Sequence, residues 1–202
     1  MKKLLLFLFL IPNLVIAETN TSNNLQVGGI SIFDNLNDHL TPKMIREGKK
    51  GLENYYKHLK TPLKFPTVAI VNHPTINKKY KRVEINYKTS NGKLIIHSIS
   101  GGEFYGNINS CYKDMNSLVE YVSQKFPNLK KLGPDKTIHT ADSSGESSVT
   151  QYSLRTDEYI VSAQCFDWSE TKTRVNNWHD NLSLVITSYD FDDWLGDTTL
   201  RN

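Results

Sequence analysis

Two pairs of alternating segments, each joined by a short turn, constrain the fold of this chain most strongly. In residues 80–88 apolar and polar side chains alternate, as expected for a strand with one buried face. Asn91-Gly92 follows, and this dipeptide is a strong signal for a two-residue β-hairpin. The turn predicts two cross-strand pairs: Tyr87 with Ile96, and Ile85 with Ser98.

A second hairpin is predicted over residues 150–165. Apolar side chains recur at every second position in both halves of this segment. A tight turn at Asp157-Glu158 would pair Leu154 with Val161, because the register of a hairpin follows from its turn. Cys165 then lies on the apolar face of the hairpin.

Helical periodicity is found in two segments. Residues 42–60 follow a capping threonine and begin with proline, which is typical of a helix start. Residues 110–126 form the stronger amphipathic pattern, with Ser110 as the predicted cap and Cys111 on the apolar stripe. Strands outnumber helices, so the sequence predicts an α+β fold. We expect a mainly antiparallel sheet built from hairpins, with the 110–126 helix packed on it and the 42–60 helix preceding it.

The amino terminus has the three parts of a secretory signal peptide. Lys2 and Lys3 precede an apolar run at 4–11, and Val15-Ile16-Ala17 is a small-residue cleavage signal. The run is much shorter than the roughly 20 residues that span a bilayer. We therefore expect export to the periplasm or the medium, cleavage after Ala17, and no transmembrane segment in the mature chain.

The rest of the chain is predicted to be one domain with a short tail. Residues 18–24 are polar and expected to be disordered, and residues 25–202 suit a single globular domain. Removing Lys2 and Lys3 from the 24 Lys and Arg residues leaves 22, against 21 Asp and Glu residues. Proteins that bind nucleic acid normally have a strong basic excess, so we expect no nucleic-acid partner.

Cys111 and Cys165 are the two cysteines of the chain. In an exported protein an isolated pair is expected to form a disulfide. A structural zinc site would need about four ligands at short spacings, and these residues are 54 positions apart. Since both periodicities place them on buried faces, we predict a Cys111–Cys165 bridge.

The stretch His139–Ser148, "HTADSSGESS", is rich in groups that occur in hydrolases. It lacks the G-x-S-x-G pattern, and the members of a catalytic triad usually come from separated parts of a chain. Small polar residues around a glycine are typical of a loop between strands, which is our interpretation. The alternative is a small secreted hydrolase that uses a triad drawn from this stretch: His139, Asp142, and Ser144 or Ser147.

No pattern for a metal or a cofactor is found in the sequence. The histidines form no H-x-x-x-H pair, and the acidic residues after position 189 do not match a calcium-binding loop. The glycine-rich stretch 101–106 matches neither of the common nucleotide-binding patterns. We therefore predict no bound metal and no cofactor.

All three tryptophans lie in the last 35 residues, beside or close to acidic residues. They either cover the edge of the core or form a surface that binds a ligand. An aromatic plate next to hydrogen-bonding groups suits a glycan or a partner protein. The candidate binding residues are Trp168, Asn177, Trp178 and Asp180.

Three classes of function remain open at this point. The first is a secreted or periplasmic, non-enzymatic binding or envelope-associated protein, whose partner would be a glycan or an envelope protein. The second is the small secreted hydrolase described above. The third is a secreted inhibitor or immunity-type protein, for which a small disulfide-linked domain is a suitable scaffold.

Overall fold

The computed structural model describes residues 18–19, 25–53 and 55–196. The predicted signal segment 1–17 lies outside this part of the chain. None of the helices in the described part is both long and apolar enough to cross a membrane.

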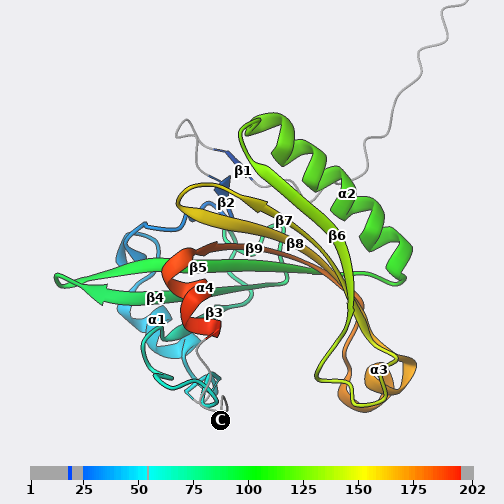
Figure 1. Cartoon of the computed structure of the whole chain (residues 1–202). Coiled ribbons are helices and arrows are strands. Elements are labelled where there is room, and N and C mark those ends of the chain that lie inside the picture. The colour runs from blue at the N-terminus through cyan, green and yellow to red at the C-terminus, as the bar shows by residue number, and fades with distance from the viewer. Residues whose placement is uncertain (1–17, 20–24, 54, 197–202) are drawn as a thin grey trace, which may run out of the picture.

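One seven-stranded antiparallel sheet organises the molecule (Figure 1). The order of its strands across the sheet is β3 (Thr67–Ile70), β4 (Arg82–Ser90), β5 (Lys93–Phe104), β9 (Asn181–Ser188), β8 (Tyr159–Asp167), β7 (Ser148–Arg155) and β6 (Lys130–Ile138). The helical segments are η1 (Leu36–Asp38), α1 (Pro42–Gly48), α2 (Ile108–Lys125), α3 (Glu170–Asn176) and α4 (Tyr189–Gly196). The predicted α+β class with a mainly antiparallel sheet is confirmed.

Both predicted hairpins are present, and one contains a bulge. Tyr87 pairs with Ile96, and Leu154 pairs with Val161, as the turns require. Beyond Tyr87 the register shifts, so Ile85 pairs with Ile99 rather than with Ser98. The shift buries two isoleucines together, which is more favourable than opposing an isoleucine to a serine in the core.

Helix α2 begins earlier than its sequence pattern predicts. Its cap is Asn107, whose Oδ1 accepts a hydrogen bond from the Ser110 amide at 3.0 Å, so Ser110 lies in the first turn. The predicted apolar stripe is buried against the sheet, where α2 contacts β8 and β9.

The N-terminal helix is much shorter than the predicted 42–60. Thr41 caps it as expected, but α1 ends at Gly48 and the chain continues in turns. A Cβ on Gly48 would lie 2.6 Å from Val68 Cγ1, so glycine allows α1 to pack closely on β3. Gly51 has φ +78°, in the left-handed region where glycine is favoured. The two glycines therefore end the helix that the apolar periodicity alone suggested.

The structure describes two residues of the segment 18–24, for which the sequence predicts disorder. Glu18 and Thr19 form β1 (Glu18–Thr19), which pairs antiparallel with β2 (Leu25–Gln26). Residues 20–24 lie outside the described part of the chain.

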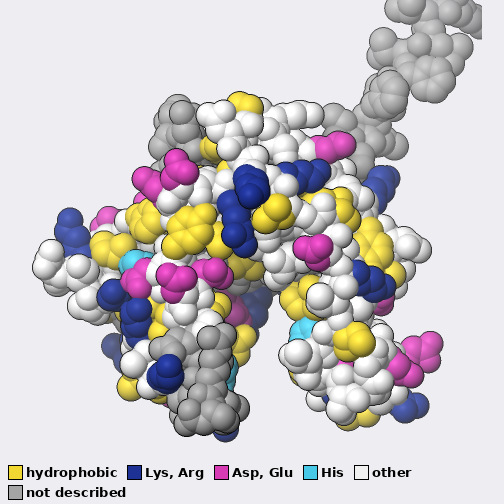
Figure 2. All heavy atoms as spheres, in the orientation of Figure 1, with side chains coloured by type: hydrophobic (Ala, Val, Ile, Leu, Met, Phe, Trp, Pro, Cys, Tyr) yellow, Lys and Arg dark blue, Asp and Glu magenta, His cyan; other side chains and the backbone are white. Residues whose placement is uncertain are grey.

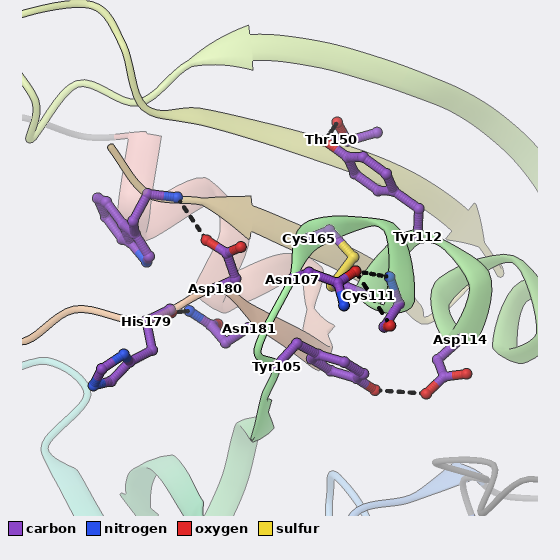
Figure 3. Close-up of a disulfide and its surroundings, with 12 residues drawn as sticks. Tyr105, Asn107, Cys111, Tyr112, Asp114, Thr150, Cys165, His179, Asp180 and Asn181 are labelled. Carbon is purple, nitrogen blue, oxygen red and sulfur yellow. Dashed lines mark hydrogen bonds between the residues drawn. A yellow bond between two sulfur atoms is a disulfide. The ribbon is translucent and has the colours of Figure 1, made fainter. Parts of the chain in front are cut away.

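Cys111 and Cys165 form the predicted disulfide. Their Cα atoms are 6.0 Å apart, and both side chains are fully buried. Figure 3 shows the bridge between Cys111 in the first turn of α2 and Cys165 on strand β8. The hydrogen bond from the Tyr105 hydroxyl to Asp114 lies beside it. The bridge ties α2 to the strand that leads directly into Phe166 and Trp168.

Candidate functional site

The two faces of the sheet carry different side chains. On the face that α2 covers, neighbouring strands align a row of buried apolar residues: Ile99, Ile186, Val161 and Leu154. On the opposite face the aligned residues are mostly small, polar and half-buried, although the apolar Val185 lies between Ser100 and Ser162. We call them the polar face: Ser100, Gln151, Ser153, Ser162, Gln164 and Ser183.

Part of the polar face is linked by hydrogen bonds. Gln164 Nε2 donates to Gln151 Oε1 at 2.6 Å, and Gln151 Nε2 donates to Ser153 Oγ at 3.0 Å. Within the described chain, the hydroxyls of Ser162 and Ser183 hydrogen-bond to no other protein group. Each hydroxyl has one donor and two acceptor sites, so this face can bind a ligand that is rich in hydroxyl groups.

One end of the polar face is covered by a buried aromatic cluster. This cluster, which we call the buried cluster, consists of Tyr56, Leu59, Phe65, Phe191 and Trp194. Two members belong to α4, which contacts β5 and β9 on this side of the sheet (Figure 1). The acidic segment after residue 189 is therefore a helix with an apolar side that packs on the sheet.

The other end of the polar face leads to a lobe formed by residues 139–147 and 168–180. Figure 1 shows this lobe, with α3 inside it, extending beyond the ends of β6–β9. Figure 2 shows the surface hollowed between the lobe and the part of the molecule that carries α1 and α4.

A buried carboxylate holds the lobe together. Asp142 accepts hydrogen bonds from the hydroxyls of Ser144, Ser147 and Ser169, the first at 2.7 Å and the last at 3.0 Å. The Ser144 and Ser147 amides also donate to it, each at 3.1 Å. These donors, led by the Ser147 hydroxyl, hold the pKa of Asp142 well below its usual range. Asp142 thus joins the 139–147 loop to the start of α3.

The lobe presents four aromatic rings to one another, and we call them the lobe cluster: His139, Phe166, Trp168 and Trp178. The ring centroids of Trp168 and Trp178 are 4.5 Å apart, and those of Trp168 and His139 are 4.4 Å apart. All four side chains are only half-buried. Phe166 is on the same face of β8 as Gln164, so the cluster continues the polar face.

Three of the four predicted binding residues come together in this lobe. Trp168 and Trp178 contact each other, and Asp180 Oδ1 accepts a hydrogen bond from the Trp168 amide at 3.0 Å. Burial raises the pKa of Asp180 above its ordinary value. Asn177 has a different role, because it is the exposed residue that ends α3 with φ +55°. Its side-chain Oδ1 hydrogen-bonds to the His179 ring at 3.1 Å.

The residues of the hydrolase hypothesis are close in space but are bonded differently from a triad. The hydroxyls of Ser144 and Ser147 donate to Asp142. The Nδ1 atom of His139 accepts from the Ala141 amide at 3.1 Å, and no hydrogen bond joins His139 to a serine side chain in the described chain. A nucleophilic serine needs a base that accepts its proton, so this geometry favours a loop held by Asp142.

The comparisons with known proteins assign no role to these residues. No family model, curated protein or solved structure matches this chain. Among the described residues, no group of three or more His, Cys, Asp or Glu side chains is arranged to hold a metal ion.

Sequence reasoning missed the polar face and two members of the lobe cluster. Ser153, Ser162 and Gln164 occupy the alternate positions of the predicted hairpin, so their common face follows from the period of a strand. Nothing in the sequence indicates that this face stays uncovered. His139 and Phe166 reach the tryptophans only through the folding of two separate loops.

Proposed function

We propose that this protein is exported and acts as a non-enzymatic binding protein that holds a glycan on its polar face. The observation that carries the proposal is the half-buried Trp168–Trp178 pair next to a floor of serine and glutamine side chains. Aromatic faces pack on the C–H surfaces of sugar rings, while hydroxyl and amide groups bind the ring hydroxyls.

Export is supported by two features. The first 17 residues have the pattern of a signal peptide, and the disulfide belongs to an oxidising compartment. Sequencing the N-terminus of the mature protein tests this part of the proposal. We expect it to begin at Glu18, and a mature chain that retains Met1 would contradict export by cleavage after Ala17.

The glycan proposal is tested with an array of immobilised oligosaccharides, followed by titration calorimetry with the sugars that bind. Trp178→Ala should weaken binding by about tenfold or more, because a central aromatic anchor contributes most to such contacts. Gln164→Ala should weaken it by a smaller factor, consistent with about 0.5–1.5 kcal/mol for one hydrogen bond.

Phe33→Ala is the matched control. Phe33 is an aromatic residue 45 % exposed, and its ring contacts His97 rather than any member of the lobe cluster. Its removal should leave binding unchanged. No binding by the wild-type protein, or equal losses for Phe33→Ala and Trp178→Ala, would refute the proposal.

A further inference from the structure

A second surface adjoins the polar face, at the start of β6. It is a cavity of about 540 Å³ between the end of α2, the β7–β8 turn and the start of α4. Three cations line it: Lys125, Lys130 and Arg155. Asp157 is the one acidic residue among its lining residues. Figure 2 shows Lys and Arg side chains gathered over the strands at this part of the surface.

Two of these cations face each other directly. Lys130 on β6 and Arg155 on β7 are cross-strand partners, and like charges at directly opposed positions destabilise a sheet. In the described part of the chain, none of the three cations forms an ion pair. An anion bound between them would relieve this repulsion.

Structural roles account for only part of the arrangement. Lysines on an edge strand such as β6 protect it from pairing with other chains, and Lys125 suits the negative end of the α2 dipole. Neither reason applies to Arg155, because β7 is an inner strand of the sheet. Arginine is also the residue whose planar fork best matches carboxylate and phosphate groups.

The cavity reaches the side of the sheet that carries the polar face at Arg155. Arg155 is two residues after Ser153 on β7, so both side chains lie on the same side of the sheet. The cavity wall is held in place by Tyr189, whose hydroxyl donates to the Thr156 carbonyl at 2.7 Å. We infer that the cavity binds an oxyanion substituent of the glycan, a carboxylate or a phosphate, so that the ligand is an acidic sugar. This inference rests on the proposed function for the identity of the ligand.

The experiment follows amide NMR signals of the labelled mature protein during titration with three monosaccharides. Glucuronate carries a carboxylate, glucose 6-phosphate carries a phosphate, and glucose carries neither. We expect glucuronate or glucose 6-phosphate to shift signals of residues 125–130 and 155–157, while glucose leaves them unchanged. The charged sugar with the lower dissociation constant identifies whether the cavity prefers a carboxylate or a phosphate.

A double variant and a charge-matched control locate the effect. Lys130→Gln with Arg155→Gln should weaken binding of the charged sugar by about tenfold or more, since two charge-assisted hydrogen bonds are lost. Lys93→Gln with Arg46→Gln removes the same charge from exposed sites elsewhere and should change binding less than about twofold.

The outcomes separate this inference from the proposed function. Identical shifts for glucose and both charged sugars, or shifts that persist unchanged in the double variant, would overturn the oxyanion site. A glycan that binds through Trp178 without any effect of Arg155 would overturn the inference and leave the proposed function standing. Charged monosaccharides that bind in the cavity, with no oligosaccharide bound at the lobe, would support the inference and refute the proposed function.

Discussion

The buried cluster and the lobe cluster are built from the same kinds of side chain but differ in burial. Trp194 is 3 % exposed, and its indole Nε1 donates to the Thr61 carbonyl at 2.9 Å. Trp168 and Trp178 are half-buried, and neither indole N–H hydrogen-bonds to another residue of the described chain. A buried tryptophan normally satisfies its N–H, whereas one that binds a ligand keeps part of its surface accessible.

The difference comes from what packs on each cluster. Residues 59–65 cover the rings of α4, so that cluster is part of the hydrophobic interior. The lobe cluster packs against the loop around Asp142, and Lys172 Nζ lies 5.5 Å from the centroid of the Trp178 ring. Its four rings nevertheless stay half-buried. The same residue type therefore stabilises the fold in one place and is available for binding in the other.

The largest expected effect is the loss of Trp194. Trp194→Ala should lower the free energy of unfolding by about 3–5 kcal/mol, because it leaves a cavity in a packed cluster. Trp178→Ala should cost only about 1 kcal/mol, since the side chain is half-buried. Equilibrium denaturation of both variants measures the contrast. Equal losses would mean that the lobe is as much a part of the core as the buried cluster.

Loss of the disulfide should destabilise both regions alike. Replacing Cys111 and Cys165 by alanine should lower the free energy of unfolding by about 4 kcal/mol, because the 54-residue separation gives a large loop-closure entropy. In both clusters, hydrogen exchange should accelerate at the most strongly protected amides, because these amides exchange through global unfolding. Acceleration in the lobe alone would show that the bridge supports only the strand next to it.

Asp142→Asn should affect the lobe and spare the buried cluster. The amide keeps the shape of the carboxylate but brings an NH₂ group against the donors of Ser144, Ser147 and Ser169. We expect faster hydrogen exchange at residues 139–147, with residues 59–65 unchanged. Faster exchange in both regions would contradict the local role.

Acid should weaken the same contacts in the wild-type protein. The pKa of Asp142 is lowered on folding, so its contribution to stability is complete above the unfolded pKa of about 3.9. That contribution is lost as the pH falls through the folded-state pKa. Exchange in the lobe should therefore accelerate at strongly acidic pH in the wild type, and this acceleration should be absent from Asp142→Asn.

The smallest expected effect concerns one histidine in each region. Burial lowers the pKa of His97, which contacts Phe65 in the buried cluster, and also lowers that of His139 in the lobe. Their contributions are complete above about pH 6.5, and they decrease at lower pH because the unfolded chain binds protons more tightly. Thermal unfolding between pH 7 and 5 should show a smaller pH dependence in His97→Gln and in His139→Gln than in the wild type. A variant whose pH dependence equals that of the wild type would show that the replaced histidine does not contribute to it.

Local patterns in the sequence determined the hairpins, the main helix and the disulfide. Asn91-Gly92 specifies a two-residue turn, and the register of that turn is sufficient to pair Tyr87 with Ile96. Helical and strand periodicities placed Cys111 and Cys165 on buried faces, and one pair of cysteines allows one bridge. The turn and the two periodicities depend on residues a few positions apart, so they can be read without knowing the rest of the fold. The disulfide joins residues 54 positions apart, and its pairing follows because the chain has only two cysteines.

Only the tertiary structure decided where α1 ends, where the register shifts and which tryptophans are buried. Gly48 ends α1 where the helix meets β3. The register shift between Asn86 and Tyr87 places Ile85 opposite Ile99, which pairs in turn with Ile186 on β9. Trp168 and Trp194 each follow an aspartate, but residues 59–65 cover only the second. The burial of Trp194 depends on a chain segment more than a hundred residues away. The identity of a side chain alone does not indicate which distant segment will cover that side chain.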